Sequence, residues 1–222
     1  MATKSTKKSS FMQLNKNICK VVPRHHLKYK ICVSGAAETG HCTPETAQKA
    51  EAIGREIACA GAVLVTGATI GVPYWAAKGA KEAGGIVIGL SPAASEISHV
   101  KTYHLPTDYH DLIIYTGFEY SGRNLLLTRA SDAVITICGR TGTLNEFTIA
   151  FEDKKANGVL EGTGGAADMI RDILTKAKRG FGKTVFSHDP KELVQKVLAL
   201  IEGAEHLAHS KVPYRPNHKD AE

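Results

Sequence analysis

Residues 62–90, AVLVTGATIGVPYWAAKGAKEAGGIVIGL, form the stretch that decides the fold. An apolar run at 62–66 is followed by a glycine loop, a helical segment at 73–83 and a second apolar run at 86–90. Short β-branched runs without polar alternation are typical of strands that are buried on both faces, as in parallel sheets. The stretch therefore predicts a strand–helix–strand unit with a right-handed crossover.

The same alternation extends along the chain on both sides of this unit. Further strands are predicted at 30–34, 112–115, 133–137, 159–160 and 184–186, and further helices at 43–59, 122–130, 142–155, 166–178 and 190–201. Strands and helices that alternate through short loops build a parallel sheet with helices on both faces. The predicted fold class is therefore α/β: a doubly wound parallel sheet in a single domain.

The positive charge of the chain is concentrated at its N-terminus. The net charge is +6, but eight of the 28 Lys and Arg residues lie within residues 1–30, which precede the first acidic residue, Glu38. The remainder has 20 basic against 22 acidic residues, so a folded nucleic-acid binder is not expected, and any nucleic-acid contact is assigned to the tail. We expect a basic, disordered tail over 1–27, a nucleotide-binding domain over 28–203 and a polar tail over 204–222.

The cysteines and histidines follow no ligand or disulfide spacing. The chain has five cysteines: Cys19, Cys32, Cys42, Cys59 and Cys138. Since none forms a C-x-x-C pair, free thiols in a reducing compartment are expected, which predicts a cytoplasmic protein. Glycine and proline interrupt the uncharged stretch 57–77, so no membrane partner is expected. The sequence predicts neither a metal site nor a cofactor.

Glycine loops follow several predicted strands, at the sheet edge where such folds bind ligands. Glycine permits positive φ and lets backbone N–H groups approach an anion, while the helix behind each loop adds its own free N–H groups. A single loop says little because tight turns also require glycine, but several loops at one edge favour phosphate. The predicted phosphate- or nucleotide-binding residues are Gly35, Ala36, Gly67, Gly139, Arg140, Thr141, Gly142, Thr143, Gly162, Gly164 and Gly165.

Three common nucleotide or catalytic motifs are missing from the sequence. The chain has no G-x-x-x-x-G-K-[ST] phosphate loop and no G-x-G-x-x-G after the first predicted strand. It also lacks the G-x-S-x-G elbow of α/β-hydrolases. The absence of these motifs argues against a P-loop ATPase or GTPase, an ordinary NAD enzyme and an α/β-hydrolase.

The most specific stretch is 122–147, GRNLLLTRASDAVITICGRTGTLNEF. Gly142 and Thr143 open a predicted helix, and Glu146 follows one turn later on the same face. Glu146 is either a functional carboxylate or a capping-box acid that accepts from the Thr143 N–H. Both interpretations place it at the mouth of the helix.

This stretch resembles the Lonely Guy family and its relatives, often called lysine decarboxylase-like proteins. Their motif is P-G-G-x-G-T-x-x-E, matched here by Gly139, Gly142, Thr143 and Glu146, and Arg123 stands where the family has an arginine on the preceding helix. The resemblance covers roughly residues 28–202, and the stretch VLEGTGGAADMI at 159–170 is typical of a divergent branch.

The resemblance implies a Rossmann-like fold that binds a nucleoside 5′-monophosphate, and a homodimer. Characterised members hydrolyse the N-glycosidic bond to release base and ribose 5-phosphate, which would make Glu146 and Arg123 the catalytic residues, with the carboxylate near an oxocarbenium-like charge. The alternative is a non-catalytic nucleotide sensor or a carrier of a molybdopterin-type cofactor. Cys138, Arg140 and Asn145 depart from the family's Pro, Gly and frequent Glu. The first two departures favour the binder, and the retained Arg123 and Glu146 favour the enzyme.

One predicted loop, 93–110, has two possible roles. It carries two tyrosines and two histidines, Tyr103, His104, Tyr109 and His110. These aromatic side chains are either a cover for the base of a nucleotide or part of an exposed connection.

Overall fold

The computed structural model describes residues 27–211, without the side chains of 205–211. The strands are β1 (Lys30–Gly35), β2 (Val63–Thr66), β3 (Ile86–Ser91), β4 (Leu112–Tyr115), β5 (Ala133–Ile137), β6 (Ala156–Leu160) and β7 (Thr184–Ser187). The α-helices are α1 (Thr46–Cys59), α2 (Val72–Glu82), α3 (Glu119–Ala130), α4 (Thr141–Glu152), α5 (Gly165–Lys176) and α6 (Pro190–Lys211), and a π-helix, η1, spans Ser98–Thr102.

All seven strands form one parallel sheet in the order β4-β3-β2-β1-β5-β6-β7. The chain starts in the middle with β1, adds strands to one edge as far as β4, and then returns to add β5 on the other side of β1. Ile31 consequently lies between Leu64 of β2 and Ala133 of β5. Because the order reverses between β1 and β5, the loops after these two strands lead to opposite faces and leave a crevice between them.

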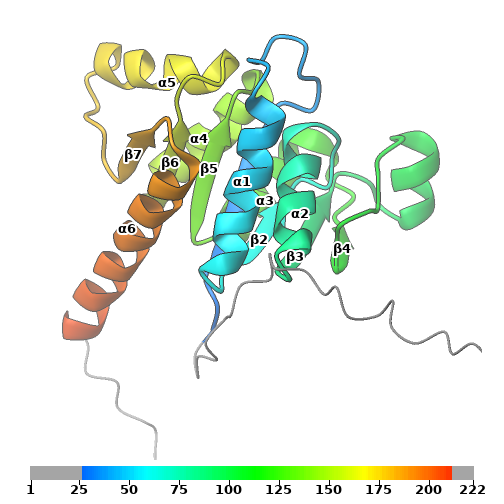
Figure 1. Ribbon diagram of the computed structural model, residues 1–222, viewed down its shortest axis with the longest axis horizontal. Coiled ribbons are helices and arrows are strands. Elements are labelled where there is room, and N and C mark those ends of the chain that lie inside the picture. Colours follow the sequence, from blue (N-terminus) through cyan, green and yellow to red (C-terminus); the bar gives the residue numbers. More distant parts are fainter. Residues whose placement is uncertain (1–26, 212–222) are drawn as a thin grey trace, which may run out of the picture.

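Helices cover both faces of the sheet, as Figure 1 shows with α1, α2 and α6 in front and α3 and α4 behind. Ile31 and Val33 of β1 pack into the main apolar cluster with α1, α2 and α6. Cys32, whose side chain points the other way, belongs to a second cluster with Leu127 of α3 and residues of β2, β3 and α4. The central strands are therefore apolar on both sides, which explains their unbroken hydrophobic sequence.

Two glycines let α1 and α2 pack backbone against backbone. A Cβ on Gly54 would lie 1.9 Å from the Ala76 carbonyl oxygen, and a Cβ on Gly79 would lie 2.0 Å from that of Glu51. Neither helix could keep this distance with a larger residue at its crossing point. The position of α2, and of the β2–α2 loop before it, therefore depends on these glycines.

The predicted fold class is confirmed: the sheet is parallel and doubly wound, and every predicted strand is present. Strand β6 begins at Ala156, earlier than the predicted 159, because buried Asn157 and Gly158 interrupt the apolar pattern without breaking the ladder. Helix α6 continues past the predicted end at 201 to Lys211. The predicted tails fall largely outside the described residues, and within 27–211 no helix has the length and apolar character needed to cross a bilayer.

The crossing of α1 and α2 gives a matched pair of glycine substitutions. Gly54→Ala should lower the free energy of unfolding by about 1–3 kcal/mol because its methyl group overpacks the contact. Gly203→Ala, in α6 with no atom near its added Cβ, should raise it by about 0.5–1 kcal/mol through helix propensity. Urea denaturation measures both values. Equal effects of the two substitutions would contradict the close helix contact.

Candidate functional site

A crevice of about 280 Å³ lies at the reversal of strand order, between the loops that follow β1 and β5. This volume is close to the lower limit for small-molecule sites. The lining comes from the two loops, the loop after β2, and the first two turns of α3 and α4. The lining residues are Gly35, Ala36, Ala37, Glu38, Thr69, Tyr120, Arg123, Asn124, Arg140, Gly142, Thr143 and Glu146.

Arg123 of α3 reaches the crevice past the end of β2. A Cβ on Gly67 would lie 1.9 Å from Arg123 Nη1, so only glycine leaves room for the guanidinium. The arginine side chain is 7% exposed, and Nη1 lies 3.5 Å from Glu146 Oε1. Within residues 27–211, its Nε has no hydrogen-bond partner. A buried guanidinium with so few partners has an uncompensated desolvation cost, which an anion in the crevice would offset.

Glu146 faces Arg123 from the second turn of α4. Its Oε2 accepts a hydrogen bond from the Ser34 hydroxyl of β1, so the carboxyl group contacts Ser34 and Arg123. Burial raises the pKa of Glu146 above its ordinary value, although Arg123 and the Ser34 hydrogen bond act in the opposite direction. The site thus favours the neutral form of this carboxyl group more than water does.

Asn124 and Tyr120 surround the pair from α3. With the Asn124 amide turned so that its nitrogen faces acceptors, this nitrogen lies 2.8 Å from Glu146 Oε1 and 2.9 Å from the Tyr120 carbonyl oxygen. In the opposite orientation it donates to Asn145 Oδ1 at 3.1 Å. The Tyr120 ring centroid lies 6.0 Å from Arg123 Cζ. The crevice therefore combines an arginine, a carboxyl group and an amide beside one aromatic ring.

The N-terminus of α4 forms another part of the crevice wall. Its N-cap residue, Arg140, makes no side-chain capping hydrogen bond, and Gly142 and Thr143 of the first turn line the crevice. Gly139 has φ of 93°, and a Cβ there would lie 2.4 Å from Thr143 Oγ1, so the sharp turn into α4 requires glycine. A helix N-terminus without a cap offers free N–H groups and a positive dipole end to an anion.

Arg140 connects the two loops at the mouth of the crevice. Its Nη1 lies 2.8 Å from Glu38 Oε2, and the two side chains are 59% and 72% exposed. Such an exposed ion pair contributes little to stability. It nevertheless occupies the guanidinium that the sequence analysis assigned to phosphate, and a ligand would have to compete with Glu38 for it.

The predicted phosphate-binding residues divide into two groups. Gly35, Ala36, Arg140, Gly142 and Thr143 line the crevice, whereas Gly67, Gly139, Thr141, Gly162, Gly164 and Gly165 are absent from its lining. Gly67 and Gly139 act behind the wall by making room for Arg123 and Thr143.

In the loop after β6, an anion of the chain itself occupies the backbone amides. The N–H groups of Gly162 and Gly164 donate to the two carboxylate oxygens of Asp168, at 2.7 and 3.0 Å. Asp168 lies in the first turn of α5, where its charge also favours the helix dipole. The backbone N–H groups of this loop therefore bind the Asp168 carboxylate of the following helix.

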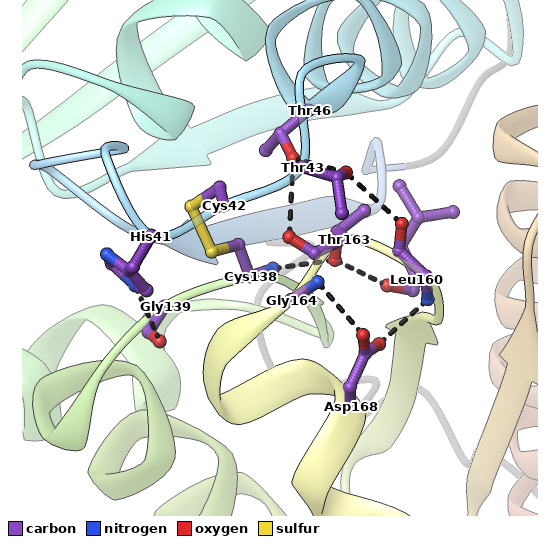
Figure 2. Close-up of a disulfide and its surroundings, with 11 residues drawn as sticks. His41, Cys42, Thr43, Thr46, Cys138, Gly139, Leu160, Thr163, Gly164 and Asp168 are labelled. Carbon is purple, nitrogen blue, oxygen red and sulfur yellow. Dashed lines mark hydrogen bonds between the residues drawn. A yellow bond between two sulfur atoms is a disulfide. The ribbon is translucent and has the colours of Figure 1, made fainter.

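A disulfide joins Cys42, in the loop between β1 and α1, to Cys138 after β5 (Figure 2). The sequence analysis expected free thiols at both positions, because the two residues are 96 positions apart and follow no spacing rule. The fold brings them together since β1 and β5 are neighbours in the sheet. Cys32 is a free cysteine, buried in the core.

The segment 93–110 does not supply the aromatic side chain that lines the crevice. His99, in η1, is fully buried, with its ring nitrogens bonded to the Ser91 hydroxyl and the Pro106 carbonyl. The His110 ring bonds to the Thr66 hydroxyl at 2.9 Å. Tyr103 stacks edge-on against Tyr120, and Tyr120 is the ring that lines the crevice.

Several residues of the crevice were missed by the sequence analysis: Ser34, Ala37, Glu38, Thr69, Tyr120 and Asn124. Ser34 had a usable signal, since it is a hydroxyl at the end of an otherwise apolar strand. Tyr120 lies three residues before Arg123 and four before Asn124, so helical spacing places its side chain next to both. Glu38 and Thr69 come from loops whose folding no local pattern describes.

The profile of the SLOG cluster4 family matches residues 28–194. An uncharacterised protein of Archaeoglobus fulgidus is 33% identical over 126 residues, which cover 57% of this chain and 78% of that protein.

Two solved structures are similar over most of the chain. The molybdenum cofactor carrier protein of Chlamydomonas reinhardtii is 29% identical, with a TM-score of 0.64, over 79% of this chain and 99% of its own. The molybdenum cofactor binding protein of Rippkaea orientalis is 28% identical, with a TM-score of 0.63, over 81% and 98%. A Rossmann-like fold of the Lonely Guy-like superfamily is thereby confirmed, on a divergent branch.

Because the pKa of Glu146 is raised, the free energy of unfolding should depend on pH differently in the wild type and in Glu146→Gln. The folded chain keeps a proton that the unfolded chain releases above the ordinary value of 4.5, so this group stabilises most below that pH. Its contribution should fall by about 1.4 kcal/mol per pH unit as the pH rises towards the folded pKa. Urea denaturation across this range should show the slope in the wild type and not in Glu146→Gln.

The control for this comparison is Glu152→Gln, in the same helix. Glu152 is 64% exposed and pairs with Arg179 at the surface, so its variant should follow the wild-type profile. Parallel profiles of Glu146→Gln and the wild type would contradict the proposed cost of burying this carboxylate.

Proposed function

Because this chain belongs to the SLOG cluster4 family, we propose that its crevice binds a small phosphate-bearing ligand, either a nucleotide or a phosphorylated cofactor. The protein holds this ligand, as a carrier or sensor does, and the chemistry of the ligand is completed elsewhere. The ligand phosphate lies between the loop after β1 and the first turn of α4, with Gly35, Ala36, Gly142 and Thr143 around it.

The observation that carries this proposal is the buried guanidinium of Arg123. It has one ionic contact, at 3.5 Å, and a buried Nε without a partner within the described part of the chain. Proteins pair buried cations closely because a buried, unpaired charge costs several kcal/mol. A phosphate oxygen in the crevice would supply the charge-assisted hydrogen bonds that the folded chain leaves unmade.

The balance of charge in the crevice also favours an anion. Its ionisable lining groups are Arg123, Arg140, Glu38 and Glu146. Burial raises the pKa of Glu146 and so disfavours a negative charge beside the guanidinium of Arg123. The α4 N-terminus adds its dipole in the same direction. Glu38 is largely exposed and can move away from Arg140 at little cost.

The solved relatives support the carrier interpretation over turnover. Two of them, 28% and 29% identical over about four fifths of this chain, are named as binding or carrying a molybdenum cofactor. The carboxyl group of Glu146 is engaged by Ser34 and Arg123, and its neutral form is favoured by burial. Burial thus works against the negative charge that would stabilise a developing positive charge on a sugar.

A second candidate function is hydrolysis of the N-glycosidic bond of a nucleoside 5′-monophosphate. It is favoured by the pairing of Arg123 with Glu146, at the positions of the Lonely Guy arginine and glutamate. In that reaction a carboxylate beside the anomeric carbon stabilises an oxocarbenium-like state. Release of free base and ribose 5-phosphate from AMP, with loss of activity in Glu146→Gln, separates this candidate from a carrier.

The binding proposal predicts a specific defect in Arg123→Gln. Isothermal titration with AMP and with a phosphorylated pterin should show binding to the wild type and about 10- to 100-fold weaker binding to this variant, because charge-assisted hydrogen bonds are lost. Gly67→Ala should weaken binding as well, since its methyl group displaces the Arg123 side chain without changing any charge.

The matched control is Arg129→Gln on the same helix. Arg129 is 60% exposed and pairs with Asp153, so its removal changes the net charge equally but leaves the crevice intact. Equal affinities of Arg123→Gln and Arg129→Gln would refute the assigned role of Arg123. The titrated samples are also analysed for free base, whose formation would favour the hydrolase.

We infer that the chain forms a homodimer through the outer face of α3. Several apolar side chains on or next to this helix are exposed: Phe118, Leu125 and Leu126. The inner face of α3 packs Leu127 into the core, so the helix is apolar on both sides. Such a helix is stable in water when a partner covers its second face.

The dimer proposal predicts that Leu126→Glu yields a monomer. A carboxylate in the covered face would be buried without a partner, so the mass measured by light scattering after gel filtration should fall by half. Met169→Glu, at a 57% exposed position of α5, should leave the mass of the wild type unchanged. A monomeric wild type, or a dimeric Leu126→Glu, would contradict the interface.

A further inference from the structure

A group of metal-ligating side chains lies beside the crevice and takes no part in it. His41, Cys42 and Cys138 place one nitrogen and two sulfur atoms within 4.8 Å of one another. Cys138 is buried, Cys42 half-buried and His41 exposed, so the group is open to solvent on the histidine side. Figure 2 shows the three side chains between the loop after β1 and the end of β5.

Contacts other than the disulfide hold the two cysteines near each other. The Thr43 N–H donates to the Thr163 carbonyl at 3.2 Å, and the Thr46 hydroxyl donates to the same carbonyl at 3.3 Å. On the other side, the Cys138 N–H donates to the Thr163 hydroxyl at 2.9 Å. Thr163 therefore ties both cysteine segments to the loop after β6, and breaking the S–S bond leaves these ties in place.

The histidine has the environment of a metal ligand. His41 Nε2 lies 3.2 Å from the Gly139 carbonyl oxygen, to which it can donate its N–H. Histidines that bind metals commonly donate one ring N–H to a backbone carbonyl, which fixes the tautomer and leaves the other nitrogen as the ligand. The Gly139 carbonyl also accepts from the Ala166 N–H at 2.9 Å, so its position is fixed by α5.

We propose that reduction of the Cys42–Cys138 disulfide creates a site for Zn²⁺, with Cys42, Cys138 and His41 as ligands and a fourth position open to solvent. Two thiolates and one imidazole are a donor set that zinc prefers over harder cations. Tetrahedral geometry with Zn–S bonds of about 2.3 Å places the two sulfurs about 3.8 Å apart, so each sulfur moves by about 1 Å on reduction. Side-chain rotation supplies this movement.

Conversion of the disulfide into the zinc site requires only a dithiol as reductant and Zn²⁺. A dithiol gives two electrons to the S–S bond, which breaks, and its two protons end on the Cys42 and Cys138 sulfurs while the dithiol becomes a disulfide. Zn²⁺ then forms two Zn–S bonds and one Zn–N bond, and the two thiol protons pass to solvent. Either the disulfide or the metal joins the loop after β1 to the end of β5, whereas the reduced, metal-free chain lacks this link.

The test compares the full chain in its oxidised and reduced states. The reduced protein, freed of dithiol under anaerobic conditions, is titrated with Zn²⁺ against a chromophoric chelator and with Co²⁺ as a spectroscopic probe. We expect one tight site per chain and a thiolate-to-cobalt charge-transfer band in the reduced protein, and neither in the oxidised protein. Cys42→Ser and Cys138→Ser should lose the band, and His41→Ala should weaken binding.

The control variant is Cys32→Ala, which removes the free cysteine of the core, leaves all three proposed ligands in place and should bind Zn²⁺ as the wild type does. Because a cysteine variant can fail to fold, a second measurement uses the wild type alone. Bound Zn²⁺ should protect Cys42, the more exposed of the two cysteines, from alkylation, as read by peptide mass spectrometry. Alkylation of Cys42 at the same rate with and without Zn²⁺, or loss of the band in Cys32→Ala, would overturn the proposal.

Discussion

The buried guanidinium of Arg123 is the group on which the arrangement of the crevice depends. It occupies space that any side chain at position 67 would fill, so the residue that follows β2 is a glycine. It faces Glu146, whose second oxygen is held by Ser34, and this links α3 to α4 and to the end of β1. Because an unpaired charge inside the protein is costly, arrangements of these four segments that separate Arg123 from Glu146 are disfavoured. The contacts that shape the site therefore also hold these parts of the domain together.

Much of the fold follows from local sequence, whereas the crevice follows from it only in part. The central strands are apolar on both faces, and this predicts a parallel sheet before any contact is known. Arg123 and Glu146 could be named from a motif. Glu38 and Thr69 could not, because their positions depend on how two loops fold across the reversal of strand order. The Cys42–Cys138 contact joins residues 96 positions apart, and only the pairing of β1 with β5 brings it about.

The glycine loops show why a pattern predicts backbone shape better than it predicts a ligand. The loops at 35–40 and 139–142 lead into the crevice, but the loop at 162–165 directs its amides at Asp168. All of them meet the requirement for left-handed or closely approached backbone that made them visible in the sequence. Residues outside a loop decide which anion its N–H groups bind. For the loop at 162–165 that residue is Asp168, the fourth residue of α5.

Cys138 and Arg140, two departures from the Lonely Guy pattern, lie in the same turn between β5 and α4. Cys138 stands where that motif has proline, and its φ is 50°, an angle that a proline ring, fixed near −65°, cannot adopt. The left-handed turn lets the Cys138 and Gly139 carbonyls accept from Ala167 and Ala166 at the start of α5, both at 2.9 Å. The sulfur of Cys138 meets Cys42, while the following residue, Arg140, turns to the mouth of the crevice. Cys138 thus supplies the cysteine pair and Arg140 the contact with Glu38, so the disulfide and the crevice share one turn of backbone. Any change in how that turn is tied, by disulfide or by metal, acts directly on the residue that precedes the first turn of α4.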